Sequence, residues 1–90
     1  MAQRRVRVFV SGKVQRVRFR ESTREQASLL GVSGWVRNVE ERVELVAEGE
    51  SEKVDALLVW LRRGPPAAKV AGLEIIEEPQ GGAETGFRVV

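Results

Sequence analysis

The order of hydrophobic patterns along the chain constrains its fold more than any single motif does. Residues 5–11 alternate, with Val6, Val8 and Val10 on one face, so they predict a strand that turns this face toward a core. Helical, extended, extended, helical and extended patterns follow in that order. The succession predicts an α+β fold of the ferredoxin-like kind, βαββαβ, in which an antiparallel sheet with two helices on one face forms a two-layer sandwich.

Both predicted helices have clear boundaries. The first covers residues 20–30, and Gly31 is expected to end it in the left-handed conformation. The second follows Ser51, which is expected to cap it, and the run Gly64-Pro65-Pro66 stops it. Its apolar stripe has the spacing of a helix packed on a sheet: Val54, Leu57, Leu58 and Leu61.

The remaining elements are expected to be strands. Residues 32–39 and 42–49 are separated by a two-residue polar turn, which predicts a hairpin. Residues 69–78 are predicted to form the fourth strand. After a loop over residues 79–82, residues 86–90 are predicted to add a short fifth strand.

Length and composition limit the function. Ninety residues predict one domain, residues 1–90. The chain lacks cysteine and histidine, which excludes disulfides, a thiolate nucleophile and the metal sites that these residues build, so no metal and no cofactor are predicted. No apolar run approaches the length of a membrane span, and residues 1–5 lack the apolar core of a signal peptide. We therefore expect a soluble cytoplasmic protein with no membrane partner.

Positive charge is concentrated in the first part of the chain. Residues 1–24 hold eight basic residues and one acidic residue, whereas the rest hold seven basic and twelve acidic residues. An uneven field of this kind favours an anionic partner near the amino-terminal third, either nucleic acid or a small phosphorylated molecule. The glutamates are expected to lie on the solvated surface, and Trp35 and Trp60 are expected to be packing residues, with Trp35 in the core.

Residues 12–20 lie between the first strand and the first helix and contain three arginines. A turn that delivers backbone N–H groups to a helix start can bind an anion, and Arg20 could grip a phosphate or carboxylate with two parallel hydrogen bonds. A solvated basic turn, with Arg20 paired to Glu21 or Glu25, would also explain this segment. Asn38 could similarly make only a local turn bond at its strand end.

Two motifs in this region resemble those of a known family. The segments GKVQRVRFR at residues 12–20 and GVSGWVRN at residues 31–38 are similar to the acylphosphatase signatures G-x-V-Q-G-V-x-F-R and G-x-x-G-W-V-x-N. The likeness continues through residues 47–49, the second predicted helix and residues 64–66, so it covers nearly the whole chain.

The resemblance implies hydrolysis of carboxyl-phosphate anhydrides to a carboxylate and phosphate, without a metal or a covalent intermediate. It implies that Arg20 clamps the phosphate oxygens and that Asn38 orients the attacking water. It also implies a small acyl-phosphate substrate. We expect the chain to be a monomer. The phosphate would be held by the loop amides of Val14, Gln15, Arg16, Val17, Arg18 and Phe19. An acyl phosphate expels a carboxylate whose conjugate acid has a pKa of roughly 4 to 5, so the absence of a histidine acid fits this chemistry.

The loop departs from the family pattern at two positions. Arg16 stands where the family usually has glycine, and Arg18 stands where a small or apolar residue is common. If the family glycine serves a positive φ, Arg16 would strain the turn by about 1–3 kcal/mol or reshape it. Activity could then be reduced, or the added guanidinium groups could slow release of the anion.

A second hypothesis is an acylphosphatase-like module with weakened or no catalysis that binds a polyanion such as nucleic acid. The residues that would support it are Arg4, Arg5, Arg7, Arg16 and Arg18. RNA-binding domains of this architecture use aromatic platforms, and only Phe9 lies opposite the valines of the first strand. Nucleic acid is therefore not the expected partner.

Overall fold

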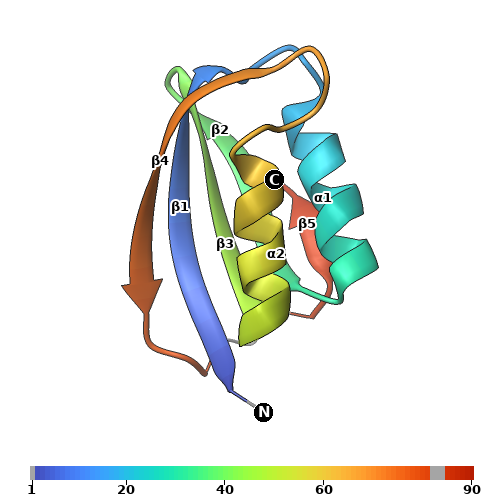
Figure 1. The fold of residues 1–90 in the computed structure, drawn as a ribbon, viewed down its shortest axis with the longest axis vertical. Helices are drawn as coiled ribbons and strands as arrows, with labels where there is room; N and C mark the ends of the chain where they lie inside the picture. Colours follow the sequence, from blue (N-terminus) through green and yellow to red (C-terminus); the bar gives the residue numbers. More distant parts are fainter. Residues whose placement is uncertain (1, 82–84) are drawn as a thin grey trace.

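Two helices cover one face of a five-stranded sheet in the computed structural model, which describes residues 2–81 and 85–90 (Figure 1). This arrangement confirms the predicted ferredoxin-like α+β fold. The elements in chain order are β1 (Gln3–Lys13), α1 (Phe19–Leu30), β2 (Ser33–Val39), β3 (Arg42–Glu50), α2 (Ser51–Leu61), β4 (Lys69–Glu78) and β5 (Phe87–Val89).

The strand order across the sheet is β4-β1-β3-β2-β5. The first four strands pair antiparallel, as predicted. β5 is present but runs parallel to β2, with Arg88 opposite Trp35, so the complete sheet is mixed rather than antiparallel. Of the loop predicted over residues 79–82, residue 82 lies outside the described residues.

The core lies between the sheet and the helices, where the alternation of β1 placed it. Val6, Val8 and Val10 are all fully buried. The apolar stripe of α2 meets them from the other layer and is also buried: Val54, Leu57, Leu58 and Leu61. Alternating residues of a strand and one stripe of a helix thus supply the two sides of the core.

The helix ends follow the predictions with one exception. Gly31 has φ 73° and ends α1, and the N–H of Val32 donates to the carbonyl of Ala27. The prediction that Ser51 caps α2 is wrong, because Glu50 occupies the cap position and Ser51 is the first helical residue. β3 runs directly into α2, and the N–H of Ser51 donates to the carbonyl of Ala2 at 2.9 Å, so this helix start uses a backbone partner.

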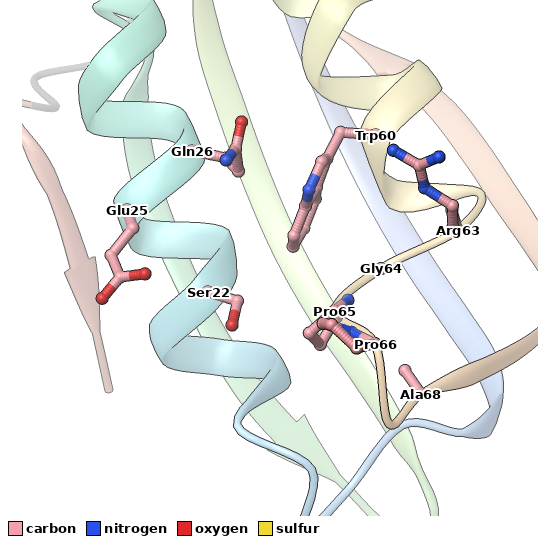
Figure 2. Close-up of a pocket in the computed structure, with 9 residues that line it drawn as sticks. All are labelled: Ser22, Glu25, Gln26, Trp60, Arg63, Gly64, Pro65, Pro66 and Ala68. Carbon is pink, nitrogen blue, oxygen red and sulfur yellow. The ribbon is translucent and has the colours of Figure 1, made fainter.

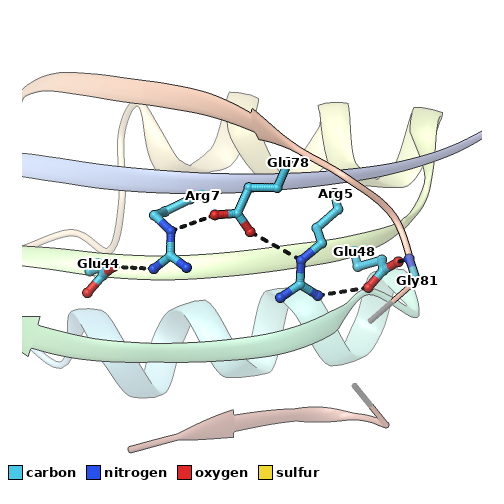
Figure 3. A network of polar contacts seen from close by, with 6 residues as sticks. All are labelled: Arg5, Arg7, Glu44, Glu48, Glu78 and Gly81. Carbon is cyan, nitrogen blue, oxygen red and sulfur yellow. Dashed lines mark hydrogen bonds and ion pairs between the residues drawn. The ribbon is translucent and has the colours of Figure 1, made fainter. Parts of the chain in front are cut away.

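The outer face of the sheet carries a chain of ion pairs (Figure 3). Arg7 bonds to Glu44 and Glu78, and Arg5 bonds to Glu78 and Glu48. The prediction that the glutamates are solvated is wrong for Glu44, which is only 4% exposed, while Glu48 and Glu78 are half-buried. β3 lies in the middle of the sheet, so arginines from the neighbouring strands cover its carboxylates.

Trp35 belongs to this outer face and not to the core. It is half-buried, with the guanidinium of Arg7 at 5.6 Å and that of Arg37 at 5.4 Å from its ring centroid. Arg37 also donates to Glu44 at 2.8 Å. The placement of Trp35 in the core was therefore wrong, although it is a packing residue, because it supports the guanidinium groups that pair with Glu44.

The pairing of Glu44 predicts a loss of stability in acid. Burial raises the pKa of its carboxyl, but hydrogen bonds from Arg37 and Arg7 outweigh burial and hold that pKa below its ordinary value. In the unfolded chain the carboxyl has an ordinary pKa of about 4.3. Its contribution to stability is therefore complete above that pH and is lost as the pH falls through the lower, folded-state pKa.

Glu44→Gln should lower the free energy of unfolding at neutral pH by about 1–3 kcal/mol, because two partly exposed guanidinium groups lose a charged acceptor. The change in this free energy between neutral pH and about pH 3, measured by urea unfolding, should be smaller than in the unsubstituted protein. Glu25→Gln removes an exposed carboxylate of α1 and is the control. If the free energy of unfolding of Glu44→Gln kept the full pH dependence, other groups would be responsible for the loss of stability in acid.

Candidate anion-binding site

The loop between β1 and α1 has an alternating backbone conformation. Arg16 has φ 63° and Arg18 has φ 61°, whereas Val17 between them is not in the positive-φ region. Such alternation turns successive N–H groups toward one side and forms a concavity that suits an anion. Arg16 thus has the left-handed conformation for which the family glycine is suited, so the loop keeps the turn and accepts the strain.

The first turn of α1 continues this concavity. Arg18 is the cap residue, and its side chain makes no capping hydrogen bond to the N–H groups of the helix start. The first backbone bond of the helix runs from the N–H of Ser22 to the carbonyl of Arg18 at 3.0 Å. The earlier N–H groups of this turn are therefore available for an anion, and the helix dipole favours negative charge there.

Packing around Phe19 fixes the start of α1. Phe19 is 2% exposed, and its ring lies 5.9 Å from that of Trp60. Gly64 has φ 69°, and a Cβ atom at this position would come within 2.6 Å of the Phe19 ring. Only glycine allows the chain after α2 to approach this closely. The carbonyl of Phe19 also accepts a hydrogen bond from the Thr23 hydroxyl at 2.7 Å.

A pocket of about 350 Å³ brings most of the predicted site residues together. Arg20 and Asn38, from α1 and β2, lie in its lining although they are far apart in the sequence. Val17 is not part of the lining, because it packs against the hydrophobic core. Glu21 is the lining residue that the sequence did not predict, and its only signal was its position next to Arg20. The full lining is Val14, Gln15, Arg16, Arg18, Phe19, Arg20, Glu21 and Asn38.

The side chain of Gln15 ties the loop to the β2–β3 turn. Its amide nitrogen donates to the carbonyl oxygens of Glu40 at 2.7 Å and Arg42 at 3.0 Å. Figure 1 shows the loop and this turn at the same end of the molecule. Because Asn38 lies two residues before Glu40, these bonds set the position of Asn38 relative to the loop. No sequence signal indicated this role.

The charges around the pocket are unbalanced. Within residues 2–81 and 85–90, the side chains of Arg16, Arg18 and Arg20 have no hydrogen-bonding or ion-pair partner. Glu21 bonds instead to Arg24 at 3.2 Å. The alternative in which Arg20 pairs with a nearby glutamate is therefore not what the structure has. Three cationic residues thus line a space that an anion can enter.

A second depression lies between the two helices (Figure 2). It has a volume of about 480 Å³, and Trp60 projects into it from α2 opposite Ser22 of α1. It contains none of the predicted site residues. Its contribution to the anion pocket is indirect, through the contact between Trp60 and Phe19.

The polyanion hypothesis loses most of its residues in the structure. Arg5 and Arg7 are held by the carboxylates of the outer face, and Arg4 bonds to Glu77 at 2.6 Å and to Asp55. The ring of Phe9 is covered by the guanidinium of Arg42, 4.5 Å from its centroid. Neither a free arginine surface nor an open aromatic platform is left on β1.

Two features are absent from the described residues. These residues contain no group of three or more acidic residues arranged to hold a metal ion. None of their helices has the length and apolar character required to cross a membrane.

Comparison with known proteins identifies matches along nearly the full chain. The family model described as acylphosphatase matches residues 6–89. An acylphosphatase of Rubrobacter xylanophilus is 59% identical over 96% of this chain and 79% of its own length, and one of Methylococcus capsulatus is 54% identical over 97% and 96%. The solved structure of an acylphosphatase from Coxiella burnetii is similar with a TM-score of 0.92 and 43% identity, over 98% of this chain and 93% of that one.

Proposed function

The chain belongs to the acylphosphatase family and is a hydrolase of acyl phosphates, and we propose that the pocket at the start of α1 carries out this reaction without a metal. The observation that carries the proposal is the joint presence of Arg20, Asn38 and the loop in one pocket. We further propose that residues 1–90 act as one monomeric, cytoplasmic domain with no nucleic-acid partner.

The loop and Arg20 would bind the phosphoryl group. The N–H groups of residues 14–20 hold its oxygens, and the guanidinium of Arg20 bonds to two of them. Both act where negative charge accumulates in the transition state, on the equatorial oxygens. The arrangement of the loop before substrate arrives means that little reorganisation is needed during the reaction.

Asn38 would place the attacking water in line with the bond that breaks. The water oxygen bonds to phosphorus while the bond from phosphorus to the carboxyl oxygen breaks. The carboxylate leaves as an anion, and both protons of the water stay with the released phosphate. Because the leaving carboxylate is a weak base, no residue has to protonate it.

Phosphate release from acetyl phosphate and benzoyl phosphate in the presence of a chelator tests this function. We expect hydrolysis well above the uncatalysed rate and no change in rate on addition of EDTA. Loss of activity with EDTA that added metal restores would contradict the proposed metal-free reaction. Absence of hydrolysis of both compounds would contradict the function itself.

Arg16→Gly should raise turnover of acetyl phosphate by about two- to fivefold, because removal of an exposed cation weakens retention of phosphate by about 0.5–1 kcal/mol. It should also stabilise the fold, since glycine adopts φ 63° without strain. Glu40→Gly is the matched control: Glu40 has φ 55° but lies outside the pocket lining. It should gain stability without a gain in turnover. Unchanged or lower turnover of Arg16→Gly would show that the loop accommodates arginine.

A further inference from the structure

The anion pocket holds more unpaired positive charge than one phosphoryl group requires. Arg16, Arg18 and Arg20 all line it, and none has a partner among the residues that the structure describes. Elsewhere in the described residues the chain pairs most of its arginines, although not the exposed Arg62 and Arg63. Six of them each pair with at least one carboxylate: Arg4, Arg5, Arg7, Arg24, Arg37 and Arg42.

The backbone makes the two extra arginines notable. Arg16 and Arg18 both have positive φ, a conformation that glycine adopts without strain and arginine does not. Both side chains are exposed, so packing does not explain their presence. A loop built only to cradle phosphate with its N–H groups would be better served by glycine at these positions. The presence of arginine at these two positions therefore requires a role for the side chains themselves.

The geometry of in-line attack determines where the acyl group lies relative to Arg16 and Arg18. In the proposed reaction the attacking water lies on the side of Asn38, which places the departing acyl group on the opposite side of the phosphorus atom. The rest of the pocket lining comes from the loop and the first turn of α1, where Arg16 and Arg18 lie. The only carboxylate in that lining, Glu21, is engaged by Arg24. An acyl group leaving the pocket thus meets positive charge.

We propose that Arg16 and Arg18 form a second anion subsite, and that the preferred substrates are acyl phosphates whose acyl group carries a second anionic group, a carboxylate or a phosphate. This inference rests on the proposed function. Guanidinium groups suit both anions because they form parallel hydrogen bonds to two oxygens. The subsite raises kcat/KM for such substrates relative to neutral acyl phosphates of the same size.

Succinyl phosphate and its methyl ester provide the test, because they differ in one negative charge and little in shape. At low ionic strength we expect kcat/KM to be about tenfold higher for succinyl phosphate, the ratio that one charge-assisted contact typically gives. This ratio should fall toward one as salt is raised to about 0.5 M, where exposed charges are screened. The ratio of the two kcat/KM values is not affected by any change in phosphate binding that both substrates share.

Variants that remove charge but keep the backbone conformation show whether Arg16 and Arg18 cause the difference in kcat/KM. Arg16→Gln and Arg18→Gln should each lower the ratio, and the double variant should bring it close to one. Arg16→Lys should keep most of the preference. Arg62→Gln removes an exposed cation outside the pocket and should leave the ratio unchanged. Should the double variant not fold, the two single variants make the same comparison.

The outcomes separate this inference from the proposed function. If acetyl phosphate is hydrolysed but the unsubstituted protein shows a ratio near one, the second subsite is overturned and the function stands. A ratio that survives in both single variants and in the double variant also overturns the subsite. If acetyl phosphate, succinyl phosphate and the ester are all stable in the presence of the protein, the function itself fails.

Discussion

Arg20→Ala is expected to lower kcat for acetyl phosphate by about 10² to 10³, the usual effect of removing one preorganised donor from a transition-state site. Arg20 lines the pocket and its guanidinium has no partner in the described part of the chain, so its charge is available to the phosphoryl oxygens. Arg20→Lys keeps the charge but cannot form two parallel hydrogen bonds, and should recover only part of the rate.

Arg24→Ala is the matched control for this substitution. Arg24 lies one turn later on α1, is similarly half-exposed, and bonds to Glu21 rather than lining the pocket. Its loss should change kcat by less than about threefold, as expected for an exposed pair. Circular dichroism and urea unfolding establish that both variants fold. An Arg20→Ala variant with near-normal kcat would place the anion site elsewhere.

Asn38→Ala is expected to lower kcat for acetyl phosphate by about 10², because a displaced nucleophile loses in-line alignment. KM should change by less than about threefold, since the loop and Arg20 still hold the phosphoryl group. A fall in kcat with little change in KM distinguishes placement of the water from binding of the substrate. Asn38→Asp keeps the shape but replaces the amide donor by a charge that repels phosphate, so it should impair both parameters.

A carboxamide outside the pocket controls for Asn38. Gln26 lies on α1 and borders the depression between the helices. Gln26→Ala should leave kcat and KM near those of the unsubstituted protein. If Asn38→Ala raised KM strongly with little effect on kcat, Asn38 would be a binding residue and the assigned placement of water would be wrong.

Much of the fold could be predicted because it depends on local periodicity. The alternation of Val6, Val8 and Val10 and the stripe of α2 both mark buried faces, and the structure buries them. The direction of β5 could not be predicted in this way, because three residues give a pattern that fits either orientation. The cap of α2 was missed because its partner, the carbonyl of Ala2, is distant in sequence.

The burial of Glu44 shows why the charged face was also missed. Alone, a glutamate in a strand indicates solvent. Its cover comes from Arg37, directly opposite on β2, and from Arg7 on β1, and both depend on strand register. A comparison of positions in one strand cannot reveal that arginines of both neighbours converge on one carboxylate. Whether such a residue is buried or exposed depends on which residues of the neighbouring strands lie beside it.

For the candidate site, the motif predicted which residues gather, and its mismatch predicted a feature of the loop. The glycine expected at residue 16 indicated a positive φ, and the structure has this φ with arginine in place. Val17 was included in the phosphate loop because the resemblance assigns the whole run of loop amides to phosphate binding, but its side chain packs against the core and not in the pocket lining. The bonds of Gln15 had no sequence signal, since a side chain's distant acceptors are not encoded by spacing.

Those bonds from Gln15 have a consequence for refolding. Its acceptor carbonyls lie 25 and 27 residues further along the chain, in the hairpin that also carries Asn38. Helix α1 can form locally, but the proposed catalytic residues Arg20 and Asn38 cannot come together until the hairpin has docked beside the loop. After dilution from denaturant, the rate at which turnover recovers therefore reports on formation of this long-range contact. Turnover should not recover before helical structure forms.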